Sequence, residues 1–296
     1  MLDGPILLLG ANGQLGRALE PVLRSIGDVQ PATRSDADLT DATGLRQIVR
    51  AVAPSLIVNA AAYTAVDAAE DDPRTAEKVN ADAPAILAEE AIRQSAGLLH
   101  YSTDYVFDGR GERPYRETDA TRPQTVYGRT KREGEQAILA TMDGHPHWIL
   151  RTSWLYGPGG NHFVSTMLHL ARERDVVQVV DDQIGAPTSA LWLADATGRL
   201  IKSAYARDDD SATSGLYHAV ARGQTSWYGF ARAIFQQYNI DVAVEPVSTE
   251  TFPRPAPRPA HSVLDTSRLR DTFGIYPLSW SRQLAEALPT LQAHKE

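Results

Sequence analysis

The run Pro5-Ile-Leu-Leu-Leu-Gly-Ala-Asn-Gly-Gln-Leu-Gly16 decides the fold of this chain of 296 residues. Its first half is a short apolar run that ends at Gly10, which predicts a strand buried on both faces of a parallel sheet. Three glycines then follow the spacing G-x-x-G-x-x-G, and the residues from Gln14 to Arg24 place their leucines on one helical stripe. A strand, a glycine turn and an amphipathic helix in this order are typical of a dinucleotide-binding fold.

The glycine turn has the properties of a pyrophosphate site. Glycine permits a tight turn and close approach of a phosphate, and a helix N-terminus offers free N–H groups and a positive dipole end. We therefore predict cofactor contacts at Gly10, Asn12, Gly13 and Gly16. The alternative interpretation is a plain strand–helix turn without a ligand.

Strands and helices continue to alternate along the chain. Further strands are expected near residues 29–32, 55–58, 97–101 and 148–150, and helices near 45–52, 73–94 and 127–141. This alternation predicts an α/β fold, a doubly wound parallel-sheet Rossmann domain over residues 1–150. Helices are expected again near 163–174, 191–204 and 227–238.

The second half of the chain predicts a smaller α/β substrate domain, interleaved with the first. We assign it about 151–185 and 221–296, because the helical segment within about 186–220 has the pattern of a return to the first sheet.

Composition narrows the classes of function. The chain has no cysteine, which excludes disulfides, thiolate nucleophiles and cysteine metal sites. Its formal net charge of -8 disfavours a nucleic-acid partner. No apolar run is long enough to span a bilayer, and the opening residues lack the basic character of a signal peptide. We expect a cytoplasmic protein with no membrane association.

The residues at the end of the second predicted strand indicate whether the cofactor is NAD or NADP. An acid there binds the ribose hydroxyls of NAD, whereas a basic residue accommodates the 2′-phosphate of NADP. The chain has Thr33-Arg34-Ser35 at this place. We expect NADPH, with Arg34 facing the 2′-phosphate, and NADH remains an alternative. An exposed loop arginine without a ligand is the other interpretation of Arg34.

Tyr127 and Lys131 form the pattern Y-x-x-x-K, which places both side chains on one face of a helix. An ammonium beside a phenol favours the phenolate, so we expect Lys131 to lower the pKa of Tyr127 toward neutrality. Such a phenol can give a proton to a carbonyl oxygen as hydride reaches the carbon, and the lysine can hold the nicotinamide ribose. The pattern also occurs by chance in helices.

Two hydroxyls end the fourth predicted strand. Ser102 or Thr103 can hydrogen-bond the carbonyl oxygen that Tyr127 protonates, and strand alternation sends only one of them toward the substrate. His100 is expected to be a buried strand residue rather than a catalyst.

Several longer runs make a family resemblance specific. They are Ser102–Gly109 (STDYVFDG), Asn59–Asp67 (NAAAYTAVD), Arg151–Tyr156 (RTSWLY), Gln183–Thr188 (QIGAPT) and Arg258–Ser262 (RPAHS). With the glycine turn and Y-x-x-x-K, they resemble the extended short-chain dehydrogenases/reductases and, among these, the dTDP-4-dehydrorhamnose reductase family. The resemblance covers nearly the whole chain.

The resemblance implies roles for individual residues. The matching catalytic residues are Thr103, Tyr127 and Lys131, which favours Thr103 over Ser102. The matching cofactor contacts are Gly13, Gln14, Leu15, Asp38, Leu39, Ala62, Tyr63, Thr64 and Tyr101, with Tyr127 and Lys131. The matching substrate contacts are Asp104 and Trp154, with Thr103 and Tyr127. The implied reaction moves hydride from NADPH to the C4 keto group of dTDP-4-dehydro-L-rhamnose, with Tyr127 as proton donor.

The residues themselves support the contact at Trp154 and add two arginines as candidate substrate contacts. The Trp154 indole follows the fifth strand and can pack against a sugar or a base, although inter-domain core is an alternative. Arg254 and Arg258 lie in a proline-rich segment and can fork onto a nucleotide pyrophosphate, with a solvated loop as the alternative.

One departure from the family concerns metal. Some members carry glutamates that bind magnesium at a dimer contact, where this chain has Ala18 and Leu191. We therefore predict no metal and a monomer or weak homodimer.

Two other functions stay open: another nucleotide-sugar reductase or epimerase, and a non-catalytic regulatory subunit like that of methionine adenosyltransferase.

Overall fold

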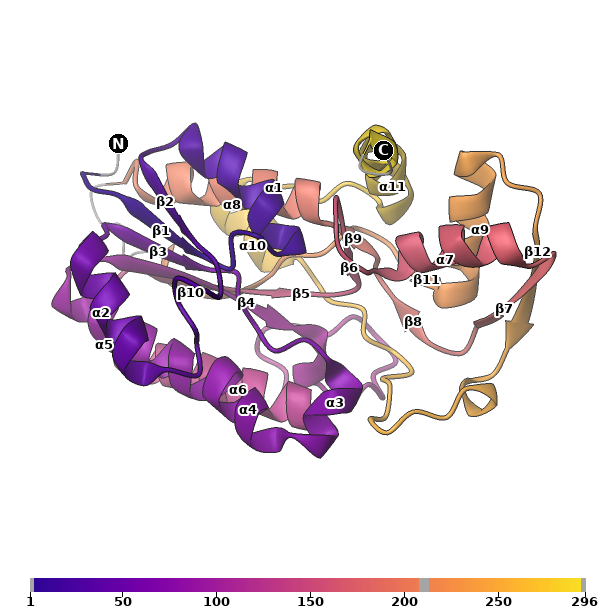
Figure 1. The fold of residues 1–296 in the computed structure, drawn as a ribbon, viewed down its shortest axis with the longest axis horizontal. Coiled ribbons are helices and arrows are strands. Elements are labelled where there is room, and N and C mark those ends of the chain that lie inside the picture. Colours follow the sequence, from indigo (N-terminus) through magenta and orange to yellow (C-terminus); the bar gives the residue numbers. More distant parts are fainter. Residues whose placement is uncertain (1–2, 208–212, 294–296) are drawn as a thin grey trace.

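The computed structural model describes residues 3–207 and 213–293. Within them the central sheet has six parallel strands, in the order β2 (Val29–Ala32), β1 (Ile6–Leu9), β3 (Leu56–Asn59), β4 (Gly97–Thr103), β5 (His147–Thr152) and β10 (Gly215–His218). The order reverses between β1 and β3, which opens a crevice at the carboxyl ends of these strands. The predicted doubly wound α/β fold is confirmed (Figure 1).

Two layers of helices cover the sheet. One face carries α1 (Gln14–Arg24), α8 (Ala190–Ala204) and α10 (Ser267–Phe273), and the other carries α2 (Ala42–Val52), α5 (Ala83–Arg93) and α6 (Val126–Thr141) (Figure 1). In β1, Ile6 and Leu8 belong to the first core and Leu7 and Leu9 to the second. Because side chains alternate across a strand, this strand is apolar at every position.

A smaller lobe lies beyond the carboxyl ends of the strands. Its core joins α7 (Phe163–Glu173), α9 (Trp227–Tyr238) and α11 (Trp280–Ala293) to a parallel pair, β7 (Val176–Val180) and β12 (Ala243–Val247) (Figure 1). Two further pairs of short strands are β6 (Leu155–Tyr156) with β9 (Thr188–Ser189) and β8 (Ile184–Gly185) with β11 (Thr225–Ser226). A 3₁₀ turn, η4, covers Thr249–Thr251. Across the described ranges, no helix has both the length and the apolar character needed to cross a membrane.

The chain passes between the two lobes several times. After β9 it returns to the sheet as α8 and β10, and then it goes back to the smaller lobe as α9 and β12. We propose the domain division predicted above with one change. Leu269 of α10 lies in the core of the sheet, and Phe273 packs on Tyr217 of β10, so we assign α10 to the dinucleotide-binding domain.

The expected helix over 73–94 is interrupted. The structure has α3 (Val66–Asp71), α4 (Pro73–Glu77), a π-helical turn η1 (Lys78–Asp82) and then α5. Asn80 in this turn is fully buried, and its side chain accepts from Tyr63 N (2.9 Å) and donates to Tyr63 O (3.0 Å). A π-turn adds a residue to the helix, and π-turns are frequent at functional sites. Here it turns an amide toward the loop after β3, which periodicity alone does not reveal.

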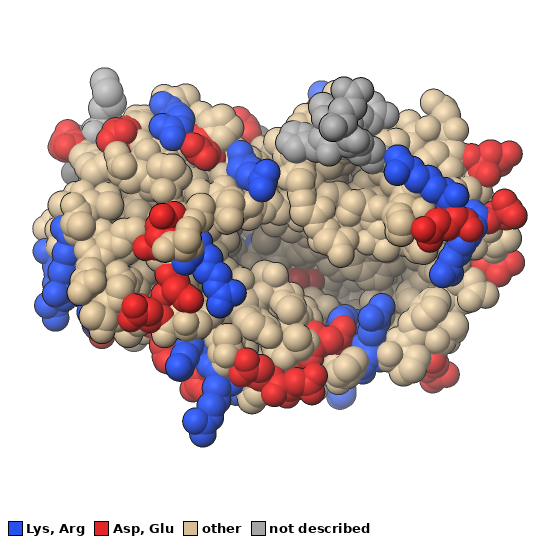
Figure 2. Space-filling view, viewed as in Figure 1, with Lys and Arg blue, Asp and Glu red and all other residues tan. Residues whose placement is uncertain are grey.

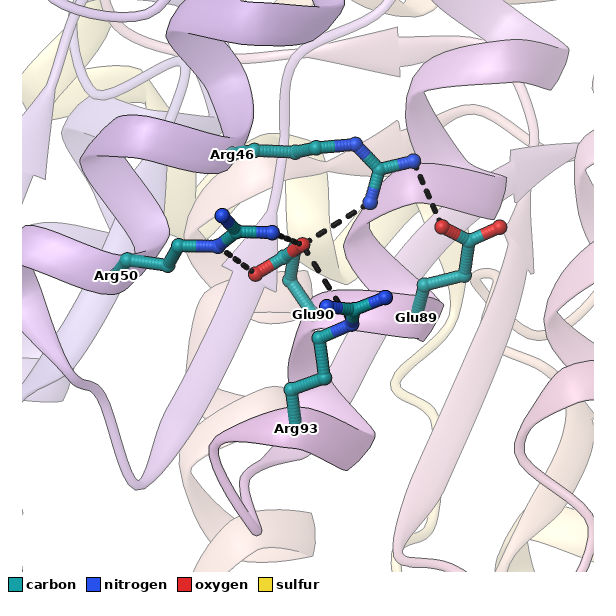
Figure 3. A network of polar contacts seen from close by, with 5 residues as sticks. All are labelled: Arg46, Arg50, Glu89, Glu90 and Arg93. Carbon is teal, nitrogen blue, oxygen red and sulfur yellow. Dashed lines mark hydrogen bonds and ion pairs between the residues drawn. The ribbon is translucent and has the colours of Figure 1, made fainter.

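Glu90 of α5 carries a buried charge between α2 and α5. Arg50 donates to its carboxylate at 2.8 and 2.7 Å and Arg46 at 3.0 Å, while Arg93 Nε lies 3.9 Å away (Figure 3). The Arg50 hydrogen bond is the largest cause that lowers the pKa of Glu90, to about 2, and burial acts against it. The helix pair is therefore held by a carboxylate that is ionised at neutral pH.

Candidate active site

A cleft of about 1490 Å³ lies between the two lobes, and Figure 2 shows the molecule hollowed there. Nearly every predicted site residue lines it: Gly10, Asn12, Gly13, Gln14, Leu15, Arg34, Asp38, Leu39, Ala62, Tyr63, Thr64, Tyr101, Thr103, Asp104, Tyr127, Lys131, Trp154 and Arg258. Gly16 is not among the lining residues. The tertiary structure thus gathers residues from seven separate parts of the sequence on one cavity.

The glycine turn fits a pyrophosphate. Gly10 has φ +77°, and a Cβ there would lie 2.8 Å from the backbone nitrogen of Ala61. A Cβ on Gly16 would lie 2.1 Å from the Gly10 carbonyl oxygen, so Gly16 serves the packing of helix on turn. In the described part of the chain no side chain caps α1, and the buried Gln14 amide nitrogen has no hydrogen-bond partner. Such unpaired donors are the groups that an anion at a helix N-terminus satisfies.

The loop after β2 presents Arg34 at the cleft. Its side chain is 81% exposed, and Nε lies 3.7 Å from Asp38 Oδ2. Asp38 itself accepts from Thr40 N (2.9 Å) and Thr40 Oγ1 (2.8 Å), and the Thr40 backbone bond is the largest cause that lowers the pKa of Asp38. The loop is therefore fixed by Asp38, while the guanidinium can turn toward a ligand.

Tyr127 lies at the start of α6, close to the end of β4. A Cβ on the next residue, Gly128, would lie 2.2 Å from the Tyr105 carbonyl oxygen, so α6 rests directly on the 3₁₀ turn η2 (Asp104–Val106). The Tyr127 and Tyr105 rings meet edge to face, with centroids 5.5 Å apart. In this position the Tyr127 phenol lies beside the Thr103 hydroxyl, which acts to lower the pKa of Tyr127.

The expected lowering of the Tyr127 pKa by Lys131 is wrong for this structure. Burial raises the pKa of Tyr127 to about 12, because the phenolate loses its solvent, and the Thr103 hydroxyl only reduces the rise. Lys131 Nζ instead donates to Tyr101 O (2.6 Å) and lies 3.0 Å from His100 Nε2. Tyr127 is thus held as a protonated phenol, the form that can donate a proton.

Lys131 is itself buried, with 1% of its surface exposed. Burial lowers its pKa to about 8, and the charge of Glu135, one helical turn further on, acts in the opposite direction. Glu135 is paired with Arg151 of β5 by two bonds of 2.8 and 2.7 Å. His100 is buried as expected, but its contact with Lys131 was not anticipated from the sequence.

Asp104 and Thr103 form a polar pair at the floor of the cleft. Thr103 Oγ1 donates to Asp104 Oδ1 (3.0 Å) and accepts from Tyr105 N (3.2 Å). Burial raises the pKa of Asp104 to about 6, against the lowering effect of the Ser262 and Thr103 hydroxyls. Ser102 also lines the cleft, so strand alternation does not remove it from the cavity.

Trp154 is in direct stacking contact with a second tryptophan that also lines the cleft. It has φ +47° and stacks on Trp227 of α9 with ring centroids 3.4 Å apart and planes 3° apart. A Cβ on Gly185 would lie 2.4 Å from the Trp154 ring, and Gln183 Oε1 accepts from Trp227 Nε1 (3.1 Å). Trp227 was not among the predicted site residues, because a tryptophan at a helix start is typical of core packing. The loop at 183–185 supports both indoles.

Arg258 forms a bidentate pair with a protein carboxylate. Its Nη1 and Nη2 donate to Asp67 Oδ1 and Oδ2 at 2.9 and 2.8 Å. Burial tends to raise the pKa of Asp67, but the Arg258 hydrogen bond and other contacts lower it overall. In this structure the guanidinium therefore forks onto Asp67, and its binding to a pyrophosphate stays a prediction. Arg254 also lines the cleft.

Known proteins resemble this chain over most of its length. A family model described as the RmlD substrate binding domain matches residues 4–293. A dTDP-4-dehydrorhamnose reductase of Burkholderia thailandensis is 44% identical over 284 residues, which are 93% of this chain and 95% of that protein.

Two solved structures agree with this likeness. The crystal structure of a dTDP-4-dehydrorhamnose reductase from Clostridium acetobutylicum is 41% identical, covers 97% of this chain and 99% of its own, and superposes with a TM-score of 0.90. That from Bacillus anthracis, in complex with NADP, is 36% identical with the same coverage and TM-score. The chain therefore belongs to the RmlD substrate binding domain family, the family of the dTDP-4-dehydrorhamnose reductases.

Proposed function

We propose that this protein reduces the C4 keto group of dTDP-4-dehydro-L-rhamnose to give dTDP-L-rhamnose, with NADPH as the reductant. The observation that carries the proposal is the buried Tyr127 phenol beside the Thr103 hydroxyl, in the cleft that also contains the glycine turn. Relatives that share 40–44% of this sequence carry the name of that reductase.

The chain offers a consistent set of contacts for the cofactor. The uncapped start of α1 and the unpaired Gln14 amide suit the pyrophosphate, and Arg34 suits a 2′-phosphate. Asn80 holds Tyr63 by two backbone hydrogen bonds, which fixes the loop with Ala62 and Thr64 on the cleft wall. When bound there, NADPH supplies the hydride.

The protein's own residues handle the proton. Tyr127, with a pKa raised to about 12, keeps its proton at neutral pH and can give it to the carbonyl oxygen as charge develops there. The Thr103 hydroxyl, which donates to Asp104 in this structure, would turn to hydrogen-bond the same oxygen. Stacked on Trp227, Trp154 forms an apolar wall for the sugar or the base.

The remaining partner assignments are proposals of the same kind. We propose that the protein acts in the cytoplasm as a monomer or weak homodimer, without nucleic acid, membrane or metal. Position 18, where the family resemblance implies a magnesium-binding glutamate in some members, is a buried alanine of α1 in the core that α1 shares with α8. An alanine supplies no carboxylate for a metal-bridged dimer.

The test is NADPH oxidation, followed by absorbance, with dTDP-4-dehydro-L-rhamnose as substrate. Tyr127→Phe should lower kcat by about 10²–10⁴-fold, since it removes the proton donor. Tyr105→Phe is the matched control, because it removes a neighbouring phenol whose ring packs on Tyr127. Stoichiometric consumption of NADPH separates a reductase from an epimerase. Folded protein that oxidises no NADPH would refute the proposal and favour the binding-subunit alternative.

A further inference from the structure

A chain of buried hydrogen bonds crosses from β3 through β4 to α6. Ala61 N donates to Asn59 Oδ1 (3.2 Å), and Asn59 Nδ2 lies 3.1 Å from His100 Nδ1. His100 Nε2 lies 3.0 Å from Lys131 Nζ, which also contacts Tyr101 O at 2.6 Å. Asn59, His100 and Lys131 are each only 1% exposed.

The backbone fixes the direction of this chain. A peptide N–H can only donate, so Ala61 holds the oxygen of the Asn59 amide and leaves the NH₂ group facing His100. The His100 Nδ1 must then accept. A neutral imidazole that accepts at Nδ1 carries its proton on Nε2, the nitrogen that faces Lys131. Burial is the largest cause that keeps the His100 pKa well below its ordinary value, so the ring is neutral.

The Nε2 proton then points at Lys131. An ammonium has three donors and no acceptor, whereas a neutral amine has a lone pair. Only the neutral amine can accept from Nε2–H and donate to the Tyr101 carbonyl at the same time. We propose that Asn59, through the tautomer that it imposes on His100, disfavours the protonated form of Lys131 and so sets the pH at which this lysine gains its proton.

Other groups around Lys131 act on the same equilibrium. The Glu135 charge favours the ammonium, although Arg151 compensates that carboxylate by its bidentate pair. Tyr127 lies one turn earlier on the same helix and is neutral. The pKa of Lys131, lowered by burial to about 8, agrees with a lysine that changes charge near neutral pH.

This inference deepens the proposed function and rests on it for its catalytic consequence. Below the pH at which Lys131 gains its proton, an ammonium lies on the same face of α6 as Tyr127, and above that pH a neutral amine lies there. Asn59 and His100 would thus act on the charge near the proton donor. Asn59 and His100 are positioning residues in this scheme, since they act on the reaction through Lys131.

The first measurement needs no substrate. The side-chain nitrogen shifts of His100 in the cofactor-free protein, assigned by comparison with His100→Gln, distinguish the two tautomers. Above the Lys131 pKa of about 8 we expect the Nε2–H form. The Nδ1–H form or an imidazolium under these conditions would overturn the proposal, whatever the enzyme activity is.

The second measurement changes Asn59. Asn59→Asp replaces the NH₂ donor by an acceptor, which favours Nδ1–H and lets Nε2 accept from the ammonium. The Lys131 pKa, followed by its Cε shift and by the pH profile of kcat, should rise by about one unit or more. Asn59→Ala removes the donor without adding a charge and should give a smaller rise. Variants that fold, as shown by their melting curves, but leave the His100 tautomer and the Lys131 pKa unchanged would refute the coupling.

Discussion

Gly128 is the residue at which the geometry of the proposed catalytic site can be perturbed most directly. It follows Tyr127, and its Cα faces the carbonyl oxygen of Tyr105 in η2. In Gly128→Ala the new Cβ would lie 2.2 Å from that oxygen, more than 1 Å inside the ordinary contact distance of 3.4–4 Å. The Cβ is fixed to the backbone of α6 and the oxygen belongs to the backbone of η2, so α6 and η2 must separate.

The size of the effect follows from this displacement. A shift of about 1 Å at a catalytic group can cost about 10²-fold in rate. Alanine is favoured over glycine in a helix by about 1 kcal/mol, whereas overpacking costs about 1–3 kcal/mol. We therefore expect kcat to fall about 10²-fold, with a modest loss of thermal stability. The affinity for NADPH should change little, because the glycine turn lies on β1 and α1.

The assay is NADPH oxidation under saturating substrate, with the NADPH Kd measured separately by fluorescence. Gly44→Ala on α2 is the matched control, since its Cβ would meet only the movable Asp41 carboxylate. It should retain wild-type kcat. If Gly128→Ala kept wild-type kcat and melting temperature, the contact of α6 with η2 would not position Tyr127 and the reasoning would fail.

Three further predictions test other parts of the structure. Arg34→Ala should weaken the binding of NADPH tenfold or more and leave the binding of NADH unchanged, since a charge-assisted hydrogen bond contributes about 1.5–3 kcal/mol. Equal losses of affinity for both cofactors, measured by titration, would argue against a contact with the 2′-phosphate. Glu135→Gln should destabilise the fold by about 3–5 kcal/mol in urea unfolding, because it leaves buried Arg151 without its counter-charge; a loss below about 1 kcal/mol would contradict this. The Glu90 pKa is lowered from 4.5 to about 2, so the ion pairs of Glu90 contribute fully to the free energy of unfolding above pH 4.5, and this contribution is lost as the pH falls toward 2. Glu90→Gln should therefore flatten the dependence of unfolding free energy on pH in this range. An unchanged slope would show that the arginines do not stabilise the Glu90 charge.

The local sequence was enough to predict the central sheet, its covering helices and the phosphate-binding turn. The apolar run at Ile6–Leu9 has no polar position to face solvent, so it specifies a strand covered on both faces. The glycines at 10 and 16 permit approaches at which a Cβ would lie within 3 Å of neighbouring backbone atoms, and a Cβ on Gly13 would be a tight 3.1 Å from one. These constraints act over a few residues, and for that reason the sheet, its helices and the phosphate turn could be predicted.

For the candidate site, the sequence predicted which residues take part but not how all of their side chains are oriented. The i, i+4 spacing places Tyr127 and Lys131 on one helical face, and the family resemblance supplied Thr103 and the loop residues 62–64. Spacing does not show where a side chain points after burial. Lys131 turns to His100 and the Tyr101 carbonyl, and burial raises the pKa of Tyr127 where a fall was expected.

What the sequence by itself determined is the alternation of strands and helices around the central sheet, the anion-binding turn and the placement of a phenol and an amine on one face of α6. Only the tertiary structure decided the contacts between residues far apart in the chain. Trp227 stacks on Trp154, Asp67 holds Arg258, and the Asn59 amide faces His100. The physical reason is that protonation states and hydrogen-bond directions depend on burial and on neighbours brought by other elements, which no local pattern encodes.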